Sequence, residues 1–133
     1  MGKRGDGWFR SLFLIASIYD LVLGLAFFSF YKPIFQYLDI ALPVYPMYLQ
    51  MAAAFVIAMG VGYFFVYLRM YQNVDLVKLG VVYKAVYSGL TSYFYFSDLA
   101  SVVFFWFAVI DFVFLILFVW FLFYSKRQRK RLQ

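Results

Sequence analysis

The sequence predicts an all-α integral membrane protein, a single domain of residues 1–133 in which four transmembrane helices form an antiparallel bundle. Composition is the first reason: 67% of the residues are hydrophobic and 14% are charged, whereas soluble domains are nearer about half and about a quarter. A chain of this size cannot bury so much apolar surface in its own interior. The second reason is that the apolar residues fall into four runs, each longer than the roughly 20 residues that a helix needs to cross a bilayer.

The predicted spans, in chain order, are residues 8–31, 48–71, 74–96 and 99–124. Tyrosine and tryptophan lie near their ends, as is common at membrane interfaces, and no alternation of period two indicates a strand. The connections after the second and third spans are short, which places consecutive spans side by side in opposite directions. We expect Asn73 to cap the third span, and the turn at Ser97 and Asp98 to cap the fourth.

The connection between the first and second spans, residues 32–47, contains all three prolines of the chain. Pro33 is suited to the first position of a short helix. Such a helix would place four apolar side chains on one side, those of Ile34, Phe35, Leu38 and Leu42. A short helix at the outer interface and an irregular loop both fit this pattern.

The basic residues predict the orientation. Ten of the twelve lysines and arginines would lie on one side of the membrane, with Lys32 alone on the other and Lys84 inside. Cytoplasmic loops carry an excess of basic residues, so we expect a multi-pass protein of the cell membrane, inner or plasma, with both termini cytoplasmic. The first span is longer than the apolar part of a signal peptide, and we expect it to be retained.

Basic side chains are also expected at the cytoplasmic membrane surface. They are Arg69, Lys78 and the cluster of the tail at 125–133, which comprises Lys126, Arg127, Arg129, Lys130 and Arg131. A cluster directly after an apolar helix is typical of a topology anchor that contacts anionic lipid. We therefore expect the lipid bilayer as a partner, and no nucleic acid.

The chain contains no cysteine, histidine or glutamate, and its six acids are all aspartates. Disulfides, thiol redox chemistry, histidine-based triads, and thiolate or imidazole metal sites are therefore excluded. A di-iron site of the four-helix type needs glutamate or histidine from several helices, and this chain cannot supply it. No cofactor or metal is predicted, and a bound lipid or quinone stays open.

Three ionisable residues are expected at similar depth in the membrane. Counted along the helices, Lys84, Asp20 and Asp111 lie about 15, 18 and 20 Å from the cytoplasmic ends of their spans. Each would cost on the order of 2.5–3.5 kcal/mol if it faced lipid. We expect all three to point inward, with Lys84 pairing with Asp20, Asp111 or both.

Small and polar residues are predicted to surround this layer. Ser17 and Gly24 flank Asp20, Gly80 and Ser88 flank Lys84, and four tyrosines could offer hydroxyls: Tyr63, Tyr67, Tyr83 and Tyr87. In the second span Ala54, Ala58 and Gly62 recur every four residues, a spacing that lets two helices approach closely.

The charged layer has two interpretations. In one, Lys84 between two aspartates is a structural ion pair that fixes how the helices meet, although buried pairs often add little net stability. In the other, two acids facing one base leave a surplus carboxylate, which could carry a proton or bind a cationic ligand.

Parts of three spans resemble a group of small four-helix prokaryotic membrane proteins described as DoxX-like or uncharacterised. The stretches are IYDLVLGLAFF, MGVGYFFVYLRMYQN and VKLGVVYKAVYS, with Asp20, Gly24, Gly62, Tyr63, Arg69, Gly80 and Lys84 as the similar positions. The resemblance implies a respiratory or quinone connection by analogy only, since a shared fold is not a shared function. Without cysteine or histidine, the chain has no evident group for sulfur redox chemistry.

Three functions fit these observations, and no catalytic site is indicated. The leading hypothesis is a structural or accessory subunit of a larger membrane complex, respiratory by the resemblance, with other membrane subunits or further copies of the chain as partners. The second is a small transporter or proton relay centred on Asp20, Lys84 and Asp111. The third is a module that binds a quinone or a lipid, because the aromatic residues of the fourth span could line a pocket for a flat ligand.

Overall fold

A computed structural model describes residues 3–132, with side chains described for residues 6–128. The helices, in chain order, are α1 (Lys3–Ser29), α2 (Tyr31–Tyr37), α3 (Pro46–Leu68), the short 3₁₀ helix η1 (Met70–Gln72), α4 (Val74–Phe96) and α5 (Val102–Leu132). Within that part of the chain all regular structure is helical, which confirms that the fold is all-α.

Three of the helices are long and apolar enough to cross a membrane. These candidate spans are Asp6–Ser29, Pro46–Leu68 and Val102–Gln128. They support the prediction of a membrane protein with transmembrane helices. α4 has the same length as α3, 23 residues, but Lys84 and several serine, threonine and tyrosine residues make it more polar.

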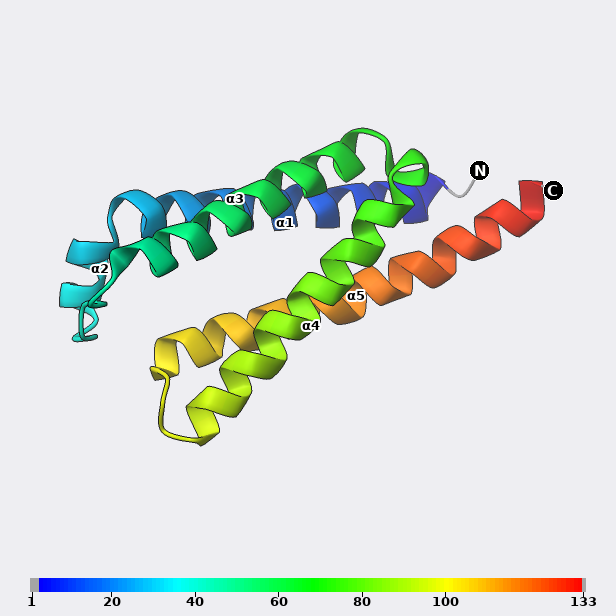
Figure 1. Cartoon of the computed structure of the whole chain (residues 1–133). Coiled ribbons are helices and arrows are strands. Elements are labelled where there is room, and N and C mark those ends of the chain that lie inside the picture. Colours follow the sequence, from blue (N-terminus) through cyan, green and yellow to red (C-terminus); the bar gives the residue numbers. More distant parts are fainter. Residues whose placement is uncertain (1–2, 133) are drawn as a thin grey trace.

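The long helices pack as two hairpins (Figure 1). α1 lies along α3, and α4 packs against α5, while contacts between the hairpins are fewer. Both termini lie at the same end of the molecule as η1, and α2 and the turn at 97–101 lie at the opposite end (Figure 1). Successive long helices therefore run in opposite directions, as the short connections predicted.

α1 and α3 approach each other most closely where small residues meet. Gly24 lies against Ala53 and Ile57 of α3. About two turns earlier on α1, the Ser17 hydroxyl donates a buried hydrogen bond of 2.7 Å to the carbonyl oxygen of Gly60. The two helices are therefore held by a close backbone approach and by a side-chain hydrogen bond.

The prediction that Ala54, Ala58 and Gly62 form the seam of α3, meaning the row of small residues where another helix approaches closely, is wrong. Ala54 and Ala58 are exposed, and a Cβ added at Gly62 would meet no atom within 4 Å. The seam lies one residue earlier, at Ala53. A shift of one residue turns a side chain by about 100° around a helix of 3.6 residues per turn, so the predicted residues face away from α1.

We expect Gly24→Ala to lower the free energy of unfolding in detergent by about 1–3 kcal/mol. The reason is steric, because the added Cβ would lie 2.6 Å from Cγ1 of Ile57 and 2.9 Å from the carbonyl oxygen of Ala53. Gly62→Ala is the matched control, since its Cβ enters open space. Thermal unfolding followed by circular dichroism compares the two variants, and equal melting temperatures would contradict the close approach of α1 and α3.

The predicted caps differ in chemistry from those in the structure. Asn73 precedes α4, but its side-chain amide donates to the carbonyl oxygens of Phe65 and Arg69, at 3.0 and 3.1 Å, and so completes the end of α3. α5 begins at Val102 instead of 99, and its first turn is capped by Ser101, whose Oγ accepts from the amide of Val103 at 3.3 Å. Asn73 therefore occupies the N-cap position of α4 as predicted, but its side chain makes no capping hydrogen bond there. The expected cap of α5 at the Ser97–Asp98 turn is wrong.

The segment between the first two spans contains the short helix that was one of the two expectations. α2 begins at Tyr31, so Pro33 is its third residue instead of its first, and Tyr31 and Phe35 are its buried side chains. The helix ends at Tyr37, and Leu42 beyond it is exposed. Leu42 is therefore not part of an apolar helix face.

Two clusters of buried apolar side chains stabilise the fold, one toward each end. The larger lies toward the termini and includes Phe9, Phe13, Tyr63, Phe118 and Phe121. The smaller lies beside α2 and is formed by Phe27, Phe35 and Ala53. The predicted charged residues lie between the two clusters.

Candidate functional site

Asp20 of α1, Lys84 of α4 and Asp111 of α5 meet in the middle of the molecule. The Lys84 Nζ atom lies 2.9 Å from Oδ1 of Asp111, close enough for a hydrogen bond, and 3.8 Å from Oδ1 of Asp20. The exposed fractions of Lys84, Asp20 and Asp111 are only 0%, 3% and 8%. We call these three residues the charged cluster; the structure brings them together as the depth count predicted.

Aromatic rings surround the lysine on the side that faces the termini. Its Nζ lies 5.3 Å from the ring centre of Tyr63, 5.1 Å from that of Phe114 and 5.8 Å from that of Phe118. These distances are within the range of cation–π attraction. The ammonium is therefore held by carboxylates on one side and by ring faces on the other.

The two carboxylates are not equivalent. Asp111 makes the short ion pair, whereas Asp20 is more distant, and its second oxygen, Oδ2, is buried with no hydrogen-bond partner among the described residues. The buried hydroxyls of Tyr19 and Tyr63 likewise have none there. Native proteins leave few buried polar atoms unsatisfied, so Asp20 Oδ2 marks a place where a proton, a water molecule or a ligand would be stabilised.

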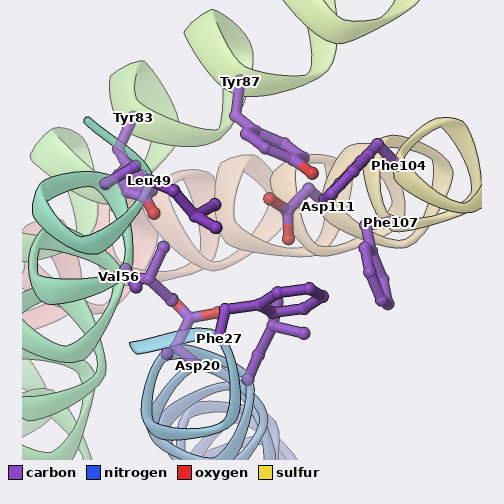
Figure 2. Close-up of a pocket in the computed structure, with 13 residues that line it drawn as sticks. Asp20, Phe27, Leu49, Val56, Tyr83, Tyr87, Phe104, Phe107 and Asp111 are labelled. Atoms are coloured by element: carbon purple, nitrogen blue, oxygen red, sulfur yellow. The ribbon is translucent and has the colours of Figure 1, made fainter. Parts of the chain in front are cut away.

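A cavity of about 110 Å³ lies beside the charged cluster, between the two hairpins and toward α2. Asp20 and Asp111 line it together with Tyr83 and Tyr87 of α4, and most of the remaining wall is apolar. Figure 2 shows these side chains converging from α1, α4 and α5 on a common space, with Phe27, Phe104 and Phe107 around it. Lys84 is not among the residues that line the cavity, so the cavity meets the cluster on its acidic side.

The other residues predicted to support the layer have different roles. Gly80 lies against the ring of Tyr63, where an added Cβ would come within 2.7 Å of Cε1. The hydroxyl of Ser88 donates to the carbonyl oxygen of Ala108 at 3.0 Å and so joins α4 to α5. Ser17 and Gly24 join α1 to α3, as described above. These four residues bring the helices together around the charged cluster.

Tyr67 does not belong to the charged layer. Its ring lies 5.7 Å from the guanidinium carbon of Arg10, and its carbonyl oxygen accepts a hydrogen bond of 3.3 Å from Nε of the same arginine. Arg10 also donates to the carbonyl oxygen of Leu68. The expectation that the Tyr67 hydroxyl serves the layer is therefore wrong, because Tyr67 is in the last turn of α3, near the termini.

The predicted surface cations are exposed where they are described. Arg69 donates to the side chain of Gln72 at 3.3 Å, and Lys78 forms an exposed ion pair with Asp75 at 3.6 Å. Lys126 and Arg127 are exposed on α5. The side chains of Arg129, Lys130 and Arg131 lie outside the described residues, although the α5 backbone continues to Leu132.

A second polar contact, near the termini, was not predicted. Oδ1 of Asp6 accepts hydrogen bonds from the hydroxyls of Tyr71 at 2.6 Å and Tyr124 at 2.9 Å. Burial and the hydrogen bond to Asp6 raise the pKa of Tyr71 above its ordinary value, so the phenol stays protonated and continues to donate. The contact joins α1, η1 and α5, and only the folded chain brings these residues together.

Comparison of the chain with protein-family models, with curated proteins and with solved structures found no match. The resemblance to DoxX-like proteins therefore stays a prediction, and the function must be argued from the site itself.

Proposed function

We propose that the chain is a four-span membrane protein, with both termini cytoplasmic, that moves a proton or a small cation through the bilayer by way of the charged cluster. The observation that carries this proposal is the position of Asp20. It is buried at the wall of a cavity, with one oxygen that has no partner among the described residues. A purely structural ion pair has no need of this second acid.

The helical arrangement supports a fourth span at α4. This helix is as long as α3 and packs along the candidate span in α5, and its lysine is buried against two carboxylates instead of facing outward. Inward pairing is how ionisable residues are accommodated within membranes. The basic residues favour cytoplasmic termini. Arg10 contacts the end of α3, beside Arg69 and η1, whereas Lys32 belongs to α2 at the opposite end of the molecule (Figure 1).

Charge balance supports a transport role for the cluster. Two carboxylates and one ammonium leave one negative charge when all three groups are ionised. A buried net charge is costly in a medium of low dielectric constant. Either a proton or a bound cation removes that charge, and ionisable residues within membranes commonly mark proton or ion pathways.

The other two predicted functions have weaker support from the geometry. The accessory-subunit hypothesis relies on the exposed aromatic surface, but contact with lipid accounts for the same surface. The quinone hypothesis has room in an open groove of about 450 Å³ between α4 and α5, which Phe96, Phe105 and Phe112 help to line, but none of the three charged residues lines that groove. The buried Asp20 oxygen without a hydrogen-bond partner among the described residues is explained by the transport hypothesis, and neither of the other two hypotheses requires it.

Proton flux into liposomes that contain the purified protein and an internal pH-sensitive dye tests the proposal. Under an imposed membrane potential, we expect flux with the unmodified protein, and with Asp20→Asn only the leak of protein-free liposomes. Asp75→Asn is the matched control, because Asp75 is an exposed aspartate at the start of α4. Flux through Asp20→Asn equal to that of the control would overturn a role for the charged cluster in proton movement.

A further inference from the structure

We infer that the cavity beside Asp20 binds the head group of a primary alkylammonium ion, with an N–H group donating to Oδ2 of Asp20 and the alkyl chain extending toward the bilayer. This inference rests on the proposed function, and it names the class of cation that the site accepts. It follows from four properties of the cavity: its charge, its walls, its size and its opening.

The charge of the cavity wall favours a cation that can donate a hydrogen bond. Asp20 and Asp111 both line the cavity, while the only lysine nearby among the described residues does not line it. Oδ1 of Asp111 already accepts from Lys84, whereas Oδ2 of Asp20 has no partner there. A charge-assisted hydrogen bond from an ammonium would satisfy that oxygen and neutralise the surplus charge.

The walls favour an ammonium with an apolar body. Phe27, Phe104 and Phe107 surround the space, and Tyr83 and Tyr87 add two further rings (Figure 2). Aromatic faces attract cations and also pack well against methylene groups. A hydrated inorganic ion would find few oxygen ligands here, and among the described residues no group of three or more acidic side chains is placed to hold a metal.

The size of the cavity favours a slender ligand. A volume of about 110 Å³ is less than that of the roughly 150 Å³ cavity that accommodates benzene. An ammonium group with a short alkyl chain fits this space, whereas an aromatic ring requires the helices to move apart. The unpartnered oxygen further favours a primary ammonium over a quaternary one, which has no N–H to donate.

The opening of the cavity indicates entry from the bilayer. Toward the termini the space is blocked by packed rings, with Phe13 and Tyr63 each 5.1 Å from Phe118 between ring centres. Toward α2 it is covered by Phe35, whose ring lies 6.0 Å from that of Phe104. Between α1 and α5 the cavity is covered by the ring of Phe27, whose centre lies 5.9 Å from that of Phe104 and 6.0 Å from that of Phe107.

The remaining side of the cavity lies between α3 and α4. These helices have few contacts and diverge from η1 (Figure 1). The cavity-lining residues Leu49, Val56, Tyr83 and Tyr87 are partly exposed there. An amphipathic cation dissolved in the membrane could therefore place its head at Asp20 and leave its chain in lipid.

Isothermal titration calorimetry of the protein in lipid nanodiscs tests the inference with n-butylammonium, using empty nanodiscs as the blank. We expect saturable binding to the unmodified protein, about ten- to a hundredfold weaker binding to Asp20→Asn, and no saturable binding of n-butanol, which has the same chain and no charge. Tetramethylammonium, a cation without an N–H group, should bind more weakly than n-butylammonium.

A second variant separates the cavity from the charge. Ala52→Phe adds a ring at the exposed edge of the cavity and leaves all three charged residues in place, and we expect it to block n-butylammonium as well. Equal binding to the unmodified protein and both variants, or equal binding of butanol, would overturn the inference. If Asp20-dependent proton flux persists without ammonium binding, the inference fails and the proposed function stands. If n-butylammonium binds and no Asp20-dependent proton flux is found, the inferred cation site stands and the proposed proton movement is refuted.

Discussion

Lys84→Met is expected to be the most damaging single substitution in the described part of the chain, lowering the free energy of unfolding by about 3–5 kcal/mol. Methionine has a similar shape, so little packing volume is lost. The damage arises because Asp20 and Asp111 then share the buried centre of the molecule without a positive charge. In the unmodified protein the Nζ atom of Lys84 lies 2.9 Å from Asp111 and 3.8 Å from Asp20, and the variant lacks this atom.

Lys78→Met is the matched control. It makes the same chemical change on the same helix, but the Lys78 side chain is 63% exposed and its partner Asp75 is 98% exposed. Exposed ion pairs contribute about 0–1 kcal/mol, so this variant should unfold close to the unmodified protein. Melting temperatures in one detergent, together with the monodisperse fraction on gel filtration, compare the two variants. If Lys84→Met and Lys78→Met had the same melting temperature, the charged cluster would have no structural role.

The depth of the charged cluster could be predicted from the sequence because depth depends only on counting along a helix. At about 1.5 Å per residue, the positions of Asp20, Lys84 and Asp111 within their apolar runs placed them in one layer. No knowledge of packing was needed. The cost of leaving such residues in lipid then predicted that they face one another, and the structure places them together.

Helix rotation and partner choice could not be predicted in the same way. Residues 52–54 of α3 are all alanine, so composition does not indicate which of them faces α1. The prediction chose Ala54 instead of Ala53 and therefore placed the seam on the exposed face of α3. The contact of Asp6 with Tyr124 joins residues 118 positions apart. Whether Asp20 or Asp111 holds the lysine depends on how the two hairpins meet, which only the assembled fold determines.

The same substitution at the two aspartates is expected to have unequal effects on stability. Asp111→Asn removes the carboxylate 2.9 Å from Nζ of Lys84, so the lysine must rely on Asp20 at 3.8 Å. Loss of a hydrogen bond to a charged group costs about 1.5–3 kcal/mol. Asp20→Asn instead leaves the short pair of Lys84 and Asp111 intact and removes the surplus charge, so its stability should equal or exceed that of the unmodified protein.

This asymmetry also separates the two interpretations of the charged cluster. Substitution of a residue that serves structure alone should lower the stability and the activity of the protein together. Substitution of Asp20 should instead abolish activity while the protein stays folded. Unfolding of both variants in the same detergent, read beside the proton flux of each, makes the comparison. Asp20→Asn less stable than Asp111→Asn would mean that Asp20 is the principal partner of the lysine, and the surplus carboxylate would then have to be sought at Asp111.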